Sequence, residues 1–290
     1  MAGQTMMMFD YERPSDWKTA TKLLAEPGAV AKMGGCDVLT RFRSGRLQAR
    51  LVVGLSRLPG LDELTFDERG VRVGAAVTLA RLAADKRFAE RWPIVANVLS
   101  KIASPAIRGS ATVVGNVAQG WSVGDLVPLF QVCNGELDVY GPSSQRRLSV
   151  VDYAKQPGNE ALRPGEVIAA LILKSAPEDG QLAYERFSFK NGFDLPLISV
   201  AVAATLKNGL CEDIRVATVG GSAMPARCTA AEAALAGRRI DDESIELATN
   251  VISRWADPPN DFRASAGYRR HVLATTFRRT LLSLQTRGSK

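Results

Sequence analysis

A pair of glycines joins an apolar segment to a helix-like segment near the N-terminus, and this junction constrains the backbone strongly. Gly34 and Gly35 follow the apolar residues 29–33, and a helical pattern resumes from Asp37. Glycine adopts positive φ without a steric penalty and lets N–H groups approach an anion. The free N–H groups and the dipole at a helix start also favour an anion. The segment fits a phosphate-binding turn, although a plain strand-to-helix turn explains these residues more simply.

A second glycine-bearing segment, 111–117, lies in a loop-like stretch without a clear helical or strand period. Thr112 and Asn116 carry side chains that can donate hydrogen bonds to a phosphate, and Asp125 can accept one from a sugar hydroxyl. The alternative is a structural loop that contains one or two buried polar side chains. Taken alone, the segment does not decide between these interpretations.

The common motifs for nucleotide and metal sites are absent from the sequence. No G-x-G-x-x-G follows a predicted strand, and there is no G-x-x-x-x-G-K-S/T, so Rossmann and P-loop sites are not supported. The one histidine, His271, has no nucleophile elbow to accompany it. The four cysteines lack metal-site spacing and indicate reduced thiols: Cys36, Cys133, Cys211 and Cys228.

The net charge of +7 is spread along the chain without one basic stripe or interleaved aromatic residues. This distribution argues against nucleic-acid binding. It fits either a solvated surface or a basic face toward acidic partner subunits or phosphates.

The length of 290 residues suits two domains. Residues 176–180 have turn composition and form the best linker candidate. We therefore expect one unit over 1–177, with subdomains of about 1–58 and 59–177, and a second unit over 178–290. No segment has the apolar length of a signal peptide or a membrane span, so we expect a soluble, cytoplasmic protein.

The apolar periods predict a mixture of strands and helices. Ser15 is the expected N-cap of the first helix, and Asn208-Gly209 is an expected hairpin turn, as is the segment 67–70. Strands are predicted at 29–33, 51–55, 64–66, 71–73, 137–140, 167–174, 197–206 and 214–219. Further helices are predicted from 37 onward and at 92–102, 228–236, 245–255 and 267–284.

Several segments, taken together and in order, resemble one known family. The motif residues are 9–11 (FDY), 33–39 (MGGCDVL), 104–118 (SPAIRGSATVVGNVA), 124–128 (GDLVP), 220–227 (GGSAMPAR) and 268–271 (YRRH). They are similar to the FAD-binding, or medium, subunit of the xanthine dehydrogenase and carbon monoxide dehydrogenase family of molybdenum hydroxylases. The similarity covers nearly the whole chain.

This resemblance implies an α+β fold. A two-subdomain FAD-binding domain of the PCMH/vanillyl-alcohol-oxidase type would occupy 1–177. A small α+β C-terminal domain, with an antiparallel sheet plus helices, would follow over 178–290.

The resemblance also implies which residues hold FAD, and it implies no catalytic side chain or metal ligand in this chain. The pyrophosphate is expected on the loop that comprises Met33, Gly34, Gly35, Cys36, Asp37 and Val38. Phosphate and the sugar-like chains are expected at Thr112, Gly115, Asn116 and Asp125. The isoalloxazine ring is expected beside Ala103, Ile107, Arg186, Asp194 and Leu195, and the adenine against Val167 and Ile168.

Two positions depart from the family pattern. Val114 stands where the family has the first glycine of Ile-Gly-Gly, and its side chain is expected to crowd the phosphate or to displace it slightly. Trp121 follows the second loop and is expected to cover the adenine or to fill a subunit contact.

The resemblance implies an oxidoreductase in which the chemistry is divided among subunits. A large subunit carries the molybdopterin cofactor, and a small subunit carries 2Fe–2S clusters. This chain would accept electrons from those clusters on FAD and pass them to an external acceptor, in an assembly expected to be a dimer of heterotrimers. A stand-alone PCMH-type flavin oxidoreductase and a non-catalytic flavin-binding module are the alternatives. The substrate and the acceptor stay open.

Overall fold

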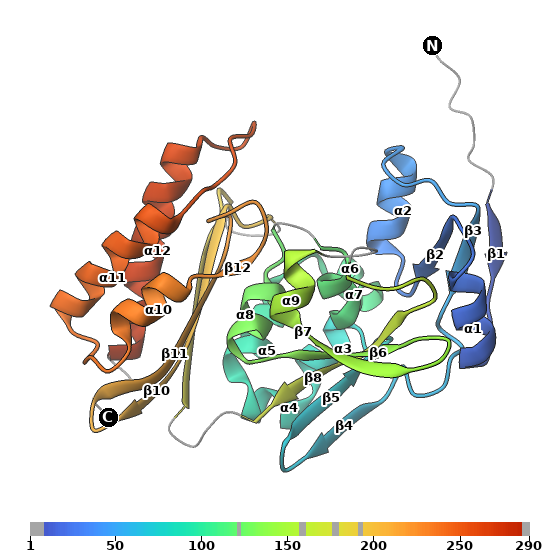
Figure 1. The fold of residues 1–290 in the computed structure, drawn as a ribbon, viewed down its shortest axis with the longest axis horizontal. Helices are drawn as coiled ribbons and strands as arrows, with labels where there is room; N and C mark the ends of the chain where they lie inside the picture. The colour runs from blue at the N-terminus through green and yellow to red at the C-terminus, as the bar shows by residue number, and fades with distance from the viewer. Residues whose placement is uncertain (1–8, 121–122, 157–160, 176–179, 191–193, 286–290) are drawn as a thin grey trace.

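The computed structural model describes residues 9–120, 123–156, 161–175, 180–190 and 194–285. Within these ranges the strands form three sheets, which lie in a row along the long axis of the molecule (Figure 1). None of the helices in these ranges is both long and apolar enough to cross a membrane. The fold is α+β, as the resemblance implies.

The first sheet is parallel, with the order β1-β3-β2. Its strands are β1 (Asp10–Glu12), β2 (Ala29–Lys32) and β3 (Leu51–Gly54), connected by α1 (Trp17–Leu24) and α2 (Cys36–Arg43). Helix α1 begins at Asp16, whose carboxylate accepts a hydrogen bond from the Thr19 amide at 2.8 Å. The expectation that Ser15 is the N-cap is therefore wrong. Serine and aspartate cap equally well, so composition alone does not fix the first turn.

The second sheet has five strands in the order β4-β5-β8-β6-β7, and all its pairs are antiparallel. They are β4 (Leu64–Asp67), β5 (Gly70–Gly74), β6 (Glu136–Tyr140), β7 (Gln145–Ser149) and β8 (Val167–Lys174). The expected turn at 67–70 forms, because the Asp67 carboxylate accepts hydrogen bonds from the amides of Arg69 and Gly70 at 2.8 and 2.9 Å. The central strand β8 is almost entirely buried.

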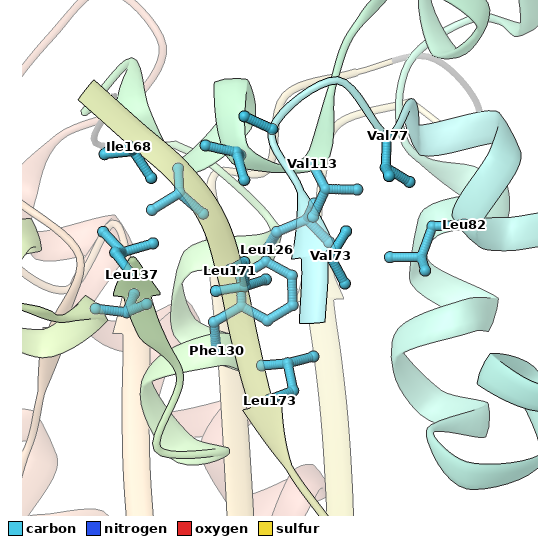
Figure 2. Close-up of a cluster of buried hydrophobic side chains, with 14 of the residues drawn as sticks. Val73, Val77, Leu82, Val113, Leu126, Phe130, Leu137, Ile168, Leu171 and Leu173 are labelled. Atoms are coloured by element: carbon cyan, nitrogen blue, oxygen red, sulfur yellow. The ribbon is translucent and has the colours of Figure 1, made fainter. Parts of the chain in front are cut away.

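Short helices surround this sheet. They are α3 (Leu79–Ala84), α4 (Lys86–Arg91), α5 (Pro93–Lys101), α6 (Pro105–Ser110), α7 (Val113–Ala118), α8 (Leu126–Val132) and α9 (Val150–Lys155). The stretch around 111–117, expected to be loop-like, thus lies among three helices, α6, α7 and α8. Each has only six or seven residues, fewer than two turns, so none displays a measurable apolar period. Figure 2 shows side chains of β5, α7, α8 and β8 meeting in one core.

Helix α8 lies between two sheets, and all seven of its residues are buried. One side contributes Leu126 and Phe130 to the core of the second sheet (Figure 2). The other side contacts strands of the third sheet, and the Gln131 amide donates to the Pro225 carbonyl at 3.1 Å. The helix therefore ties the two halves of the chain together.

The third sheet is antiparallel, in the order β12-β11-β10-β9. Its strands are β9 (Gly180–Phe187), β10 (Ile198–Lys207), β11 (Leu210–Val219) and β12 (Ala226–Arg227), and α10 (Thr229–Leu235), α11 (Asp242–Trp255) and α12 (Ala266–Gln285) follow. Asn208 and Gly209 have φ of +53° and +77°, which suits the tight hairpin turn predicted there. Most of the predicted linker, 176–179, lies outside the described residues.

The motif at 268–271 has a structural role. Arg269 is 2% exposed and binds both carboxylate oxygens of Asp261, at 2.8 and 2.7 Å. It also donates to the Leu197 carbonyl at 3.2 Å. A buried guanidinium needs such partners, and this one fastens α12 to the loop before it and to the start of β10.

We expect Phe130→Ala to destabilise the chain by about 3–5 kcal/mol, because the ring is fully buried and its loss leaves a cavity. Phe262→Ala is the matched control: that ring is 99% exposed, and its removal should change stability by less than about 0.5 kcal/mol. Urea denaturation of the isolated chain measures both values. Equal effects of the two substitutions would contradict the position assigned to α8.

Candidate functional site

The two glycine-bearing segments touch each other. A Cβ atom on Gly34 would overlap the Ser110 carbonyl oxygen and would lie 3.4 Å from the Cα of Ala111. Backbone atoms cannot swing aside as the end of a side chain can, so only glycine fits at residue 34. The contact places the turn between β2 and α2 against the junction between α6 and α7 (Figure 1).

The first segment presents backbone donors. Gly35 has φ +80° and is the N-cap of α2, with no side chain that caps the helix. The first N–H groups of a helix have no acceptor within the helix, so those of Cys36, Asp37 and Val38 face outward from its start. The turn follows the carboxyl end of a parallel strand, where ligands of α/β sheets usually bind. This arrangement can hold an anion such as a pyrophosphate.

Lys32 is a site residue that the sequence reasoning missed. Its Nζ lies 3.4 Å from the position that a Cβ on Gly35 would take, so the ammonium group lies over the turn. The same group lies 6.0 Å from the centre of the Tyr11 ring. A lysine that ends a strand just before paired glycines was the available signal, because its side chain can reach a bound phosphate.

The second segment is clamped in place by hydrogen bonds. The Thr112 hydroxyl accepts from the Gly115 amide at 3.0 Å and so caps α7, and Thr112 also forms a β-bridge with Thr78. A Cβ on Gly115 would lie 2.7 Å from that hydroxyl oxygen, so the glycine lets the cap form. The structure thus gives Thr112 and Gly115 a capping role beside any ligand contact.

Asn116 carries an unpaired acceptor. Its Oδ1 is buried and finds no hydrogen-bond partner among the described residues. Buried polar atoms are nearly always paired, so an orphan acceptor next to the two loops fits a missing ligand donor. Val114, two residues earlier on the same helix, is 3% exposed within the hydrophobic core. The effect of its side chain on a bound phosphate stays a prediction, and Trp121 lies outside the described residues.

Asp125 lies at the N-cap position of α8 and is paired with two residues of β9. Tyr184 donates to its Oδ1 at 2.6 Å, and the Arg186 Nε lies 3.6 Å from the same oxygen. The carboxyl is 7% exposed, and this burial raises its pKa, although Arg186 and the Tyr184 hydroxyl oppose the rise. Burial and the nearby carboxylate raise the pKa of Tyr184 as well. The cluster joins the two halves of the chain beside the loops.

Tyr184 was also missed from the sequence. Tyr184 and Arg186 stand two residues apart on β9, so both side chains lie on the same face of the strand. The expected residue Arg186 donates through Nη2 to the Asp194 carbonyl at 2.5 Å, which brings residue 194 to the cluster. The sequence signal that could have identified Tyr184 is this pair of polar residues two positions apart, in the segment before the apolar strand β10.

The other expected residues occupy different environments. Ala103 and Ile107 lie at the junction of α5 and α6, where Ile107 is 46% exposed. Leu195 is 45% exposed. Val167 and Ile168 are 4% and 5% exposed and belong to the core, at the start of β8, the strand that packs against α7. Among the described residues, no group of three or more His, Cys, Asp or Glu side chains is placed to hold a metal ion.

Two family descriptions match the chain. Residues 7–173 match the FAD binding domain in molybdopterin dehydrogenase, and residues 183–284 match the CO dehydrogenase flavoprotein C-terminal domain. The first match alone covers more than half of the sequence.

Individual relatives match over nearly their whole length. The chain is 27% identical to the 6-hydroxypseudooxynicotine dehydrogenase complex subunit alpha of Paenarthrobacter nicotinovorans, which covers 94% of this chain and 93% of that one. It is 26% identical to the xanthine dehydrogenase FAD-binding subunit of Escherichia coli O157:H7, over 94% and 96% of the two chains. The structure of reconstituted CO dehydrogenase from Oligotropha carboxidovorans superimposes with a TM-score of 0.88 at 26% identity, over 94% and 96%.

We expect Gly34→Ala to lower FAD affinity at least about tenfold, because the new Cβ meets the backbone of residues 110 and 111 and separates the loops. Gly109→Ala, on the neighbouring helix α6, is the matched control, since nothing lies within 4 Å of its added Cβ. That control should bind FAD normally and gain up to about 1 kcal/mol from helix propensity. Fluorescence titration with FAD and urea denaturation measure the two effects. Unchanged affinity in Gly34→Ala would refute the importance of the contact.

The raised pKa of Asp125 predicts a pH-dependent stability. The pKa of Asp125 in the folded chain lies above the ordinary value of 3.8, so the folded chain holds this proton more tightly than the unfolded chain does. The stability that the protonated carboxyl contributes is therefore lost as the pH rises through the folded pKa. Asp125→Asn should therefore gain stability relative to the wild type above pH 3.8, by up to about 1.4 kcal/mol per pH unit. Urea denaturation of the FAD-free proteins between about pH 4 and 7 measures this difference. A relative gain by the wild type would reverse the assigned direction.

Proposed function

The chain belongs to the family of FAD-binding domains of molybdopterin dehydrogenases, and on this premise we propose that its two glycine loops together hold the pyrophosphate of FAD. The chain is the FAD-binding subunit of a molybdenum hydroxylase, an oxidoreductase whose substrate is oxidised on another subunit. The observation that carries the proposed site is the contact between Gly34 and Ser110, because it unites two segments that are far apart in sequence.

The residues present fit the cofactor. The amides of Gly34, Gly35 and Cys36 would face the pyrophosphate, and Met33, Asp37 and Val38 would border it. The Lys32 ammonium group over the turn would add a positive charge. The orphan Oδ1 of Asn116 would accept from a hydroxyl of the cofactor, since no donor reaches it from the part of the chain that the structure describes. Thr112 would hold α7 in place and can still donate its own hydroxyl hydrogen.

The interdomain cluster would bind the sugar-like chain and the ring. Asp125 would accept from a ribityl or ribose hydroxyl, held in position by Tyr184. Arg186 would lie near the flavin, but the neighbouring Asp125 carboxylate offsets much of the positive charge of the guanidinium. The main role of Arg186 would therefore be to orient the Asp125 carboxylate and the backbone at Asp194. Ala103, Ile107 and Leu195 would border the isoalloxazine. Val167 and Ile168 would contribute the core surface behind the adenine.

The cofactor and its partners complete the activity. When bound, FAD supplies the redox chemistry, in which electrons that arrive singly are collected in pairs for an external acceptor. The electrons would come from 2Fe–2S clusters on a small subunit, after hydroxylation at a molybdopterin centre on a large subunit. We place the chain in a cytoplasmic dimer of heterotrimers.

We also place the boundary between the two domains between residues 177 and 178. The family matches to residues 7–173 and 183–284 lie on either side of this boundary, which supports it.

A stand-alone flavin oxidoreductase is the competing function. Relatives named as complex subunits match this chain over 93% and 96% of their own length. This agreement in extent with subunits of multi-chain enzymes supports the subunit assignment.

Purification of the chain alone tests the proposal. We expect a yellow protein whose FAD is released by acid, and we expect no hydroxylation of carbon monoxide, aldehydes, purines or N-heteroaromatic compounds. Addition of the large and small subunits encoded beside it should restore turnover. Substrate oxidation by the isolated chain would contradict the subunit role, and a colourless chain that binds no added FAD would contradict the FAD site.

A further inference from the structure

We propose that Arg108 is a positioning residue that holds Ala103 in a left-handed conformation and thereby fixes the wall against which the first glycine loop rests. The inference depends on the FAD site proposed above and extends it to a residue that does not contact the cofactor itself.

Ala103 has an unfavourable backbone conformation. Its φ of +52° lies in the left-handed region, which an L-residue other than glycine enters at a cost. The preceding helix α5 closes with the hydrogen bond from the Ile102 amide to the Val98 carbonyl at 3.0 Å. The following helix α6 opens at once, because the Ser104 hydroxyl accepts from the Ile107 amide at 3.3 Å. Ala103 is therefore the middle one of the three residues that connect the two helices, and it is the one with positive φ.

Arg108 offsets the cost at this turn. Its Nη1 donates to the Ala103 carbonyl at 2.7 Å and to the Ile102 carbonyl at 3.0 Å. Both acceptors flank the left-handed residue, and the donor is a charged group, which makes these bonds stronger than neutral ones. The guanidinium is partly buried, so solvent weakens the bonds less than it would at a fully exposed site.

Helix α6 packs against α3, and its C-terminal end is held where the Leu79 amide donates to the Ala111 carbonyl at 2.9 Å. None of the residues of α6 is fully buried, so the helix has no deep anchor in the core. At its N-terminal end, the two bonds from Arg108 brace the turn that sets where the helix points. The helix ends at Ser110, whose carbonyl meets Gly34. An altered turn at Ala103 would therefore move the wall of the candidate site.

Substitutions at the two positions test the link. We expect Arg108→Ala to weaken FAD binding about tenfold, because strain of the usual size for a left-handed residue is then unopposed. Ala103→Gly removes the strain, so the double variant should regain affinity to within about threefold of the wild type. Fluorescence titration with FAD measures the affinity, and visible circular dichroism of the bound flavin reports its surroundings.

Arg91→Ala is the matched control. Arg91 also donates from one Nη1 to two backbone carbonyls, those of Asp67 and Gly70, at 2.9 and 3.4 Å, but at a turn of the second sheet away from the loops. Its loss should leave FAD affinity unchanged. Arg108→Lys keeps one charged donor and should fall between the wild type and Arg108→Ala, which provides a folded variant if the alanine substitution prevents folding.

The outcomes separate this inference from the proposed function. Wild-type affinity in Arg108→Ala, or an equal loss in Arg91→Ala, would overturn the positioning role. A loss in Arg108→Ala that Ala103→Gly does not restore would also overturn it, since the guanidinium would then act by another route. If Arg108→Ala does not fold, a loss in Arg108→Lys that Ala103→Gly does not restore would overturn it in the same way. Failure of the wild-type chain to bind FAD would instead contradict the FAD site.

Discussion

The backbone contact between Gly34 and Ser110 is the constraint on which the candidate site depends. It has no room for a Cβ atom, so it explains a glycine at residue 34 by contact between two parts of the protein. The contact presses the turn of the first, parallel sheet against helices that belong to the second sheet. The first segment supplies the backbone donors of a helix start, and the second segment lies against it. Together they place the free amides of a helix start, a lysine ammonium group and an orphan asparagine oxygen around one junction.

Helix α8 makes the corresponding connection to the other half of the chain. Its burial between two sheets fixes Asp125 at its start, where Tyr184 and Arg186 from β9 reach the carboxylate. Burial of that carboxylate costs stability, which two partners offset in part. Functional sites commonly retain groups that a purely structural core would not contain. The cluster therefore fits a role in binding better than a role in folding.

Much of the fold follows from the sequence, and its exceptions have physical causes. The strands β8, β10 and β11 and the longer helices have clear apolar periods, and the Asn208-Gly209 turn has a specific conformational requirement, so these were predictable. Strand β9 is as long as β8 but was not predicted, because only one of its residues is fully buried. Helices α6, α7 and α8 were not, because helices of six or seven residues are set by caps and tertiary packing. Of the site, the glycine loops and Asp125 could be identified in advance. Lys32 and Tyr184 had only weak local signals, and Arg108 had none, since its role arises from contacts that motif letters do not encode. Val114 differs from the residue that the motif has at this position, and the fold buries its side chain in the core.

A crystal structure of the chain with FAD bound tests the central claim most directly. The account predicts that the pyrophosphate lies at the junction of the two glycine loops, with its oxygens within hydrogen-bond distance of the amides at the start of α2 and with α7 beside it. It also predicts that the Gly34–Ser110 contact is retained. A pyrophosphate bound away from this junction, or loops that separate when FAD binds, would contradict the account.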